Sequence, residues 1–313
     1  MLQQIKKAIF ILSFVVILLG IGIYHSARFS KIMSRGNYFF EETRDNIKIK
    51  TIILEFPQNQ TITIEKKNDL WYIGEADDYF ASFAQLNSLF RLLRQTTIYR
   101  ADVIDEKKLS EIEKNSFILK TLDDKGKIVD QAFIQPKHKG IRFNYATLNN
   151  NHLLYQIKGN FELSHNPMDW IQAPLLNIAD RAIKSVRSSR FHVYRRFSAE
   201  NLKDINTDKT MHIEQLLSNL WYLSAIDVKH AVHFNRTQYQ KSQNYEITTF
   251  GGLIYLIDIF TDGTDFWLNI KMEHEPTVSA EDMRLYKENH TLYEGWFFKI
   301  NPEIGALING FKL

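Results

Sequence analysis

The N-terminal stretch from Ala8 to Tyr24 constrains this chain most, because it carries no charged residue and is apolar on every face of a helix. At about 1.5 Å per residue, a helix of this length reaches about 26 Å, close to the thickness of a bilayer core. The stretch therefore predicts a transmembrane helix. Arg28, Lys31 and Arg35 precede the first acidic residue, Glu41, and such a run suits anionic lipid head groups.

Three alternatives for this stretch are a cleaved signal peptide, a lipoprotein anchor and a buried core helix. A core helix is disfavoured because the stretch is apolar on all faces. A signal peptide has small residues at positions −3 and −1 of its cleavage site, and the exit Tyr24-His25-Ser26-Ala27 fits that pattern poorly. A lipoprotein anchor needs a cysteine, and the chain has none. We therefore expect a single-pass protein of the bacterial inner membrane, with its N-terminus in the cytoplasm and its C-terminal domain in the periplasm.

The charge balance argues against a nucleic-acid-binding protein. The chain has 39 basic and 36 acidic residues, and three of the basic ones, Lys6, Lys7 and Arg28, lie before residue 31, where there is no acidic residue. The remainder is balanced and lacks the basic excess typical of nucleic-acid-binding domains. The absence of cysteine excludes disulfides, thiolate metal sites and a cysteine nucleophile.

Beyond the connector, the pattern predicts strands and one clear helix. Alternating apolar residues predict strands at 47–56, 61–64, 70–73, 97–103, 117–122, 128–134, 141–145, 153–157, 245–250, 253–260 and 266–270. Ser82 and Gln85 form a capping box, and Phe83, Leu86 and Leu93 follow at helical spacing. This pattern favours a helix of about a dozen residues packed on a sheet.

The same element order recurs about 130 residues later. That shift aligns Gln85-Leu86-Asn87-Ser88 with Gln215-Leu216-Leu217-Ser218, and Leu93 with Leu223. We therefore expect an α+β fold in which one N-terminal transmembrane helix precedes two tandem related units, each a mostly antiparallel sheet with a packed helix. The expected boundaries are 1–30 for the anchor, 31–46 for the connector, 47–180 for the first unit and 181–313 for the second.

These features together resemble the bacterial DUF4340 family. The resemblance is carried by the hydrophobic N-terminus, Asn68-Asp69-Leu70-Trp71-Tyr72-Ile73, Trp170, and the opening Ile183-Lys184-Ser185-Val186 of the second unit. It covers about Ile49 to the C-terminus, and no tryptophan in the second unit matches Trp71. Members resemble auxiliary components of ABC-type transport systems, including those linked to gliding motility. The resemblance implies permease and ATPase subunits as partners and carries over no catalytic residue.

No motif specifies a reaction. His230 and His233 have metal-ligand spacing on a helix, but their surroundings predict a strand, where residues three apart face opposite ways. Asp262-Gly263-Thr264-Asp265 is typical of a hairpin turn and lacks the spacing of a calcium loop. Asp77-Asp78 are adjacent in a predicted loop, which does not hold the separation that acid-base catalysis needs. Without a nucleophile elbow or a phosphate-binding loop, we expect no enzyme, no cofactor and no metal site.

Aromatic residues are the candidates for partner binding. In the helix around Leu216, the residues Ile213, Leu216, Leu220 and Leu223 define the buried face, which leaves Trp221 and Tyr222 toward its edge. The C-terminal residues Phe297, Phe298 and Phe311 are further candidates, although a final strand that closes the sheet is the simpler interpretation of these stretches.

We therefore expect a non-enzymatic accessory or scaffold subunit of an ABC-type transport assembly. The first alternative is an independent envelope-binding module that recognises glycan or lipid. The second is a hydrolase whose site assembles from distant residues such as His192, His212 and Asp258.

Overall fold

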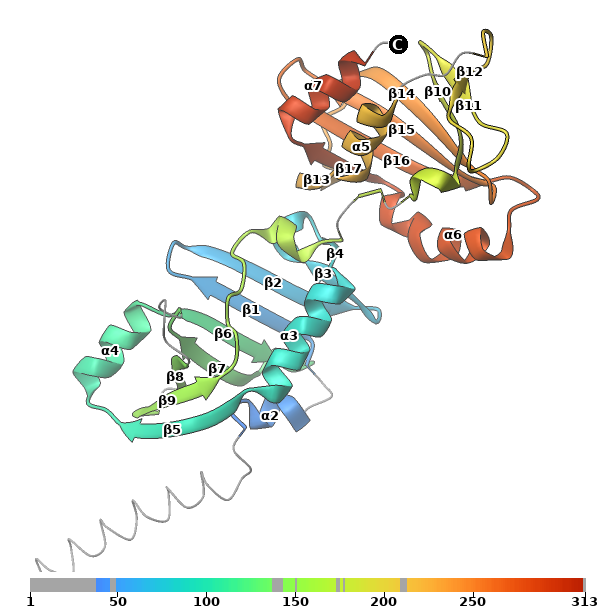
Figure 1. Ribbon diagram of the computed structural model, residues 1–313. Helices are drawn as coiled ribbons and strands as arrows, with labels where there is room; N and C mark the ends of the chain where they lie inside the picture. Colours follow the sequence, from blue (N-terminus) through green and yellow to red (C-terminus); the bar gives the residue numbers. More distant parts are fainter. Residues whose placement is uncertain are drawn as a thin grey trace, which may run out of the picture. The chain divides into compact units, whose positions relative to one another are not determined.

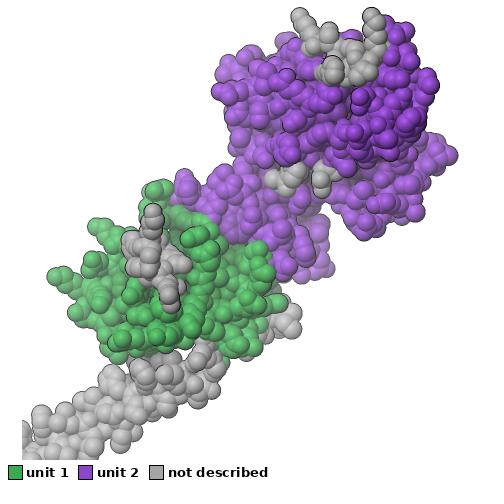
Figure 2. All heavy atoms as spheres, in the orientation of Figure 1, with its two compact units in different colours: residues 1–59, 88–163 green, residues 60–87, 164–313 purple. Residues whose placement is uncertain are grey.

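The computed structural model describes residues 38–45, 49–136, 143–149, 151–172, 175–176, 178–208 and 213–311. The predicted transmembrane stretch, Arg28, Lys31 and Arg35 lie outside these residues, and so does His212. The chain divides into two compact units, and each of them is discontinuous in sequence (Figure 2). Unit 1 comprises residues 1–59 and 88–163, and unit 2 comprises residues 60–87 and 164–313.

The first sheet has nine strands in the order β4-β3-β2-β1-β6-β7-β8-β9-β5 (Figure 1). Strands β4, β3 and β2 pair in that order, and so do β1, β6, β7, β8, β9 and β5. All of these pairs are antiparallel. Strands β2, β3 and β4 are counted with unit 2. The strands are β1 (Thr51–Phe56), β2 (Gln60–Lys67), β3 (Leu70–Ile73), β4 (Tyr79–Phe80), β5 (Thr97–Val103), β6 (Phe117–Leu122), β7 (Ile128–Ile134), β8 (Asn144–Leu148) and β9 (Leu153–Lys158), and the helices are α2 (Glu41–Asp45), α3 (Phe83–Gln95) and α4 (Glu106–Lys114).

The second sheet has eight antiparallel strands in the order β12-β11-β10-β14-β15-β16-β17-β13 (Figure 1). If β4 is left out, the strands of the first sheet follow the same order as those of the second sheet. Strand β10 then corresponds to β1, and β13 corresponds to β5. The strands are β10 (Ile183–Ser188), β11 (His192–Tyr194), β12 (Lys203–Asp204), β13 (Ala225–His230), β14 (Gln240–Thr249), β15 (Leu253–Thr261), β16 (Phe266–His274) and β17 (Trp296–Ile300), and the helices are α5 (Glu214–Trp221), α6 (Ala280–Tyr293) and α7 (Pro302–Gly310). Three short 3-10 helices complete the described elements: η1 (Gly74–Ala76), η2 (Pro167–Trp170) and η3 (Asp180–Ala182).

The predicted strands form because their alternating apolar residues all lie on one face, and this face is buried. In β15 the inward residues Leu253, Tyr255, Ile257 and Ile259 are buried, and the residues between them are more exposed. Strands β3, β5, β6 and β7 have the predicted bounds. Helix α3 starts where the capping box predicts, since the backbone N–H of Gln85 donates to the Ser82 hydroxyl. The predicted turn at Asp262-Gly263 joins β15 to β16, with Gly263 at a φ of 97°.

A buried carboxylate holds α2 to the first sheet within unit 1. Asp130 on β7 accepts hydrogen bonds from the backbone N–H and the hydroxyl of Thr43, at 3.0 and 2.6 Å. The Thr43 hydroxyl also lies 2.8 Å from that of Thr121. Burial raises the pKa of the Asp130 carboxyl, while the bonds from Thr43 act in the opposite direction. The first described helix is therefore fixed by a polar cluster inside the unit.

The predicted fold class and location are corrected in one respect. A membrane-spanning helix needs about 20 apolar residues, and the longest helix of the described residues, α6, has 14 and carries several charges. Nowhere in the described ranges is a helix both long and apolar enough to cross a membrane. The prediction of a single-pass inner-membrane protein with one transmembrane helix is therefore wrong for the described part, which consists mainly of two large antiparallel sheets.

Candidate functional site

The candidate site lies in unit 2, where the turn between β3 and β4 presents Tyr79. Asp77 and Asp78 both adopt left-handed backbone conformations, with φ of 56° and 58°, which lets the chain reverse after η1. Tyr79 is consequently directed inward and is almost fully buried. Its ring makes edge contacts with Trp296 and Phe298 of β17, at centroid distances of 4.9 and 5.4 Å. The turn thus places the ring of Tyr79 against strand β17 of the second sheet.

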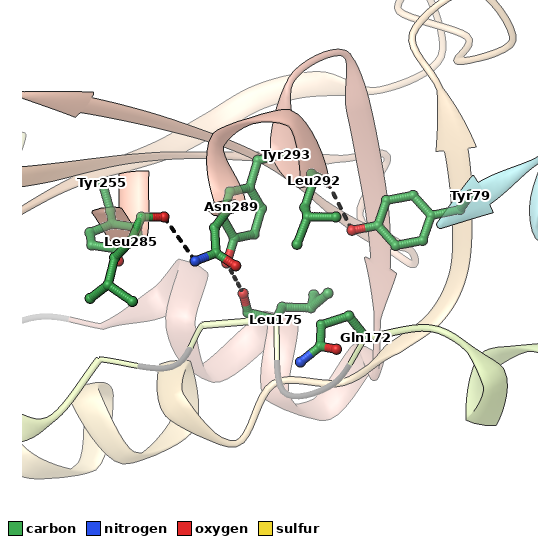
Figure 3. A pocket seen from close by; sticks show the side chains of 8 residues that line it. All are labelled: Tyr79, Gln172, Leu175, Tyr255, Leu285, Asn289, Leu292 and Tyr293. Atoms are coloured by element: carbon green, nitrogen blue, oxygen red, sulfur yellow. Dashed lines mark hydrogen bonds between the residues drawn. The ribbon is translucent and has the colours of Figure 1, made fainter. Parts of the chain in front are cut away.

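A pocket opens beside Tyr79 (Figure 3). Its volume is about 100 Å³, and its walls come from β4, β15, α6 and the segment that follows η2. The lining residues are Tyr79, Gln172, Leu175, Tyr255, Leu285, Asn289, Leu292 and Tyr293. None of them carries a formal charge at neutral pH, so the pocket combines aromatic rings, leucines and neutral polar groups.

Hydrogen bonds to the main chain fix three of these side chains (Figure 3). The Tyr79 hydroxyl donates to the carbonyl of Leu292 at 2.8 Å, and the Tyr293 hydroxyl donates to that of Leu175 at 2.6 Å. The side-chain amide of Asn289 donates to the Leu285 carbonyl at 2.9 Å, one turn earlier on α6. The walls are therefore held in place without any other bound molecule.

Several hydrogen-bonding groups remain for a ligand. No hydrogen bond from another described residue occupies the Tyr255 hydroxyl, the side-chain oxygen of Asn289 or the exposed amide of Gln172. Tyr255 itself is buried and lines the pocket. The pocket therefore offers donors and acceptors together, which suits an amide or a hydroxyl group.

The tyrosines of the pocket stay neutral at physiological pH. Burial raises the pKa of Tyr255 to about 12, and the neighbouring Asp282 carboxylate acts in the same direction. Burial also raises the pKa of Tyr79 and of Tyr293. A phenol with a raised pKa donates hydrogen bonds but does not act as a base near pH 7. These groups therefore suit recognition better than proton transfer.

The raised tyrosine pKa values predict a loss of stability at alkaline pH. The folded pKa lies above the ordinary value of 10.0, so the stabilisation from a neutral Tyr255 is fully present below pH 10 and is lost as the pH rises toward 12. We expect the free energy of unfolding of the wild type to fall across this range, and that of Tyr255→Phe to fall less steeply. Urea unfolding at a series of pH values measures both slopes, and equal slopes would contradict the assignment.

The two histidines selected from the sequence lie close to the pocket's turn. The backbone N–H of His230, at the end of β13, donates to Asp77 at 2.7 Å. His233 lies in a turn rather than in the predicted strand, and its Nδ1 is 2.8 Å from the same carboxylate. Among the residues with described positions, no group of three metal-binding side chains gathers here or elsewhere. Asp77 and the histidines therefore hold the turn that presents Tyr79.

The aromatic residues predicted to bind a partner lie in different environments. Tyr222 is 78% exposed, whereas Trp221 is half-buried and its indole N–H has no hydrogen-bond partner among the described residues. Phe297 and Phe298 are buried in β17, and Phe311 makes an edge contact with Phe191. Tyr222 is therefore the one member of this set with a ring mainly on the surface.

The sequence did not reveal the pocket residues. They come from positions around 79, 172, 255 and 290, and no spacing rule links such distant segments. Helix α6, which supplies four of them, was not predicted either, because it carries charged residues on several faces and lacks a clear apolar stripe. The available signal was the capping residue Ser279, whose hydroxyl accepts from the N–H of Asp282.

No family model, no curated protein and no solved structure matches this chain. The resemblance to the DUF4340 family therefore stays a prediction from the sequence. What the chain does has to be argued from the geometry of its own residues.

Proposed function

We propose that this chain is a non-enzymatic binding protein whose unit 2 receives a neutral, polar-tipped side chain of a partner protein in the Tyr79 pocket. The observation that carries the proposal is the pocket lining, which combines apolar walls with a hydroxyl on Tyr255 and a side-chain oxygen on Asn289 that have no hydrogen-bond partner among the described residues. Asparagine, glutamine, serine and threonine side chains present the matching donors and acceptors.

The size of the pocket favours a side chain over a larger ligand. Pockets for drug-sized molecules measure about 300–1,000 Å³, whereas this pocket measures about 100 Å³. A buried side chain in such a pocket, surrounded by contacts that exclude water, is the usual form of a binding hot spot. The pocket therefore fits one anchoring residue of a protein surface.

The family resemblance supports the setting of this interaction. Auxiliary proteins of ABC-type transport systems bind permease and ATPase subunits, and these are the partners that we propose. In this setting the chain acts as an accessory scaffold, and the pocket contributes recognition rather than chemistry.

A glycan is the second candidate ligand, and the pocket lining favours it over lipid. Sugar hydroxyls and acetamido groups match the neutral donors and acceptors of the pocket, and Tyr79 and Tyr293 provide aromatic surface next to them. The pocket has no cationic residue to hold an anionic lipid head group.

Filling the pocket tests the proposal. The variant Leu285→Trp places an indole in the pocket, and Leu307→Trp is the matched control because Leu307 is an exposed leucine on α7 that does not line it. We expect full-length wild type and Leu307→Trp, purified from the native host, to bring down a permease and an ATPase in stoichiometric amounts by mass spectrometry. We expect Leu285→Trp to reduce this recovery about tenfold or more, as loss of a hot spot does.

Two results would decide against the protein-partner proposal. If Leu285→Trp keeps the same partners at the same recovery, the pocket is not the contact. If no partner is recovered, calorimetric titration of the wild type with chito-oligosaccharides tests the glycan candidate, which requires binding that Leu285→Trp abolishes and Leu307→Trp leaves unchanged.

A further inference from the structure

The corresponding edge strands of the two sheets, β13 and β5, have different surroundings. In unit 2, the edge strand β13 packs against β4, η1 and η2, and the backbone N–H of His230 at its end donates to Asp77. Strand β5 takes the same place in the first sheet, at the end of the strand order next to β9 (Figure 1). Among the described residues, its outer side has fewer backbone partners.

Only the beginning of β5 has a neighbour on its outer side among the described residues. Tyr38 forms a single bridge to Thr97, and the backbone N–H of Phe39 donates to the Thr96 carbonyl at 2.9 Å. From Ile98 to Val103, β5 pairs only with β9 within the described part of the chain. Such an edge is a template for another strand.

The side chains of residues 98–103 are complementary to those of the same segment in a second copy of the chain. After a bulge at Tyr99, residues Arg100 to Val103 pair with β9 in a regular register. Arg100 and Asp102 lie on the same side of the strand and form an ion pair, with Nη2 and Oδ1 2.8 Å apart. Tyr99 and Val103, which flank this pair, are 59% and 65% exposed.

We propose that β5 pairs with β5 of a second copy of this chain, antiparallel and centred on Ala101. This register sets Arg100 opposite Asp102 of the second copy, and by symmetry Asp102 opposite the second copy's Arg100. Two nine-stranded sheets would then become continuous through one isologous contact.

Charge placement distinguishes this edge from a protected one. Edge strands are commonly protected by charges that repel a second copy. Here the two opposite charges stand at equal distances on either side of Ala101, so a two-fold axis brings unlike charges together. One strand pair buries less area than an obligate interface needs, so we expect a dimer that dissociates on dilution.

The absence of native cysteine allows a direct test on the full-length chain. In the variant Ala101→Cys, the two thiols meet at the two-fold axis, where opposite Cβ atoms come as close as about 4.5 Å, the upper end of the Cβ separation in disulfides, and oxidation should join them. The control Val232→Cys places a thiol on unit 2 at a position that is 75% exposed. We expect a disulfide-linked dimer on a non-reducing gel for Ala101→Cys, and only background linkage for Val232→Cys.

Charge reversal identifies the register. Added to Ala101→Cys, the single change Asp102→Arg sets like charges opposite each other and should reduce cross-linking about tenfold, whereas the double change Arg100→Asp with Asp102→Arg should restore it. Circular dichroism confirms that each variant is folded. Cross-linking of folded Ala101→Cys at the level of Val232→Cys, or cross-linking that ignores the charge reversal, would overturn the proposal.

Discussion

Replacing Tyr79 with alanine is expected to lower the free energy of unfolding of unit 2 by about 3–5 kcal/mol, the cost of truncating a buried aromatic residue. Tyr79 is almost fully buried, and its ring contacts Trp296 and Phe298 on β17. The variant would also lose the hydrogen bond to the Leu292 carbonyl. Urea unfolding followed by tryptophan fluorescence measures the change, because the Trp296 ring lies against Tyr79.

The variant Tyr79→Phe separates the ring from its hydroxyl. It keeps the contacts with Trp296 and Phe298 and leaves the Leu292 carbonyl without its donor, so we expect a loss of about 1–3 kcal/mol. A loss for Tyr79→Ala no larger than that for Tyr79→Phe would show that the ring contributes little to stability.

The second large effect is expected at Gly305, where α7 lies against Phe266. A methyl group at this position would come within 2.4 to 2.6 Å of the ring and the Cβ atom of Phe266. Phe266 is buried at the start of β16, and its Cβ cannot move without moving the strand. We therefore expect Gly305→Ala to destabilise unit 2 by about 1–3 kcal/mol, the usual range for overpacking.

Gly310, at the end of the same helix, is the matched control. Apart from its chain neighbours and the backbone of its own helix, no described residue has an atom within 4 Å of a Cβ built on Gly310. Alanine is favoured over glycine in a helix by up to about 1 kcal/mol, so Gly310→Ala should leave the stability unchanged or raise it slightly. Thermal unfolding of the two variants side by side measures the difference, and equal melting temperatures would contradict close packing at Gly305.

Local patterns explain why many strands and one helix were predictable. The alternation in β3, β5, β6 and β7, and the capping box before α3, are encoded within a few residues, and these elements have the predicted positions. The buried face of α5 was also correct, since Ile213, Leu216, Leu220 and Leu223 are all buried. Short-range sterics and burial are sufficient to specify such elements.

The candidate site could not be predicted because its residues meet only through long-range packing. Tyr79 and Tyr293 look like ordinary aromatic residues in the sequence, and only the packing of β4 and α6 in unit 2 brings them to one pocket. His233 was misplaced for the same reason. A turn held by Asp77, more than 150 residues away, overrides the local strand pattern.

The contact between Tyr79 and Leu292 cannot form until the ribosome has synthesised both residues. The two residues are 213 positions apart, so at about 5–20 residues per second a ribosome needs about 10–40 s to make the second after the first. During that interval Trp296 and Phe298 do not yet exist, and the turn of β3 and β4 holds an aromatic side chain without the surface that buries it. Until residues 292–298 have been synthesised, this hairpin therefore exposes an apolar side chain of the kind that chaperones bind.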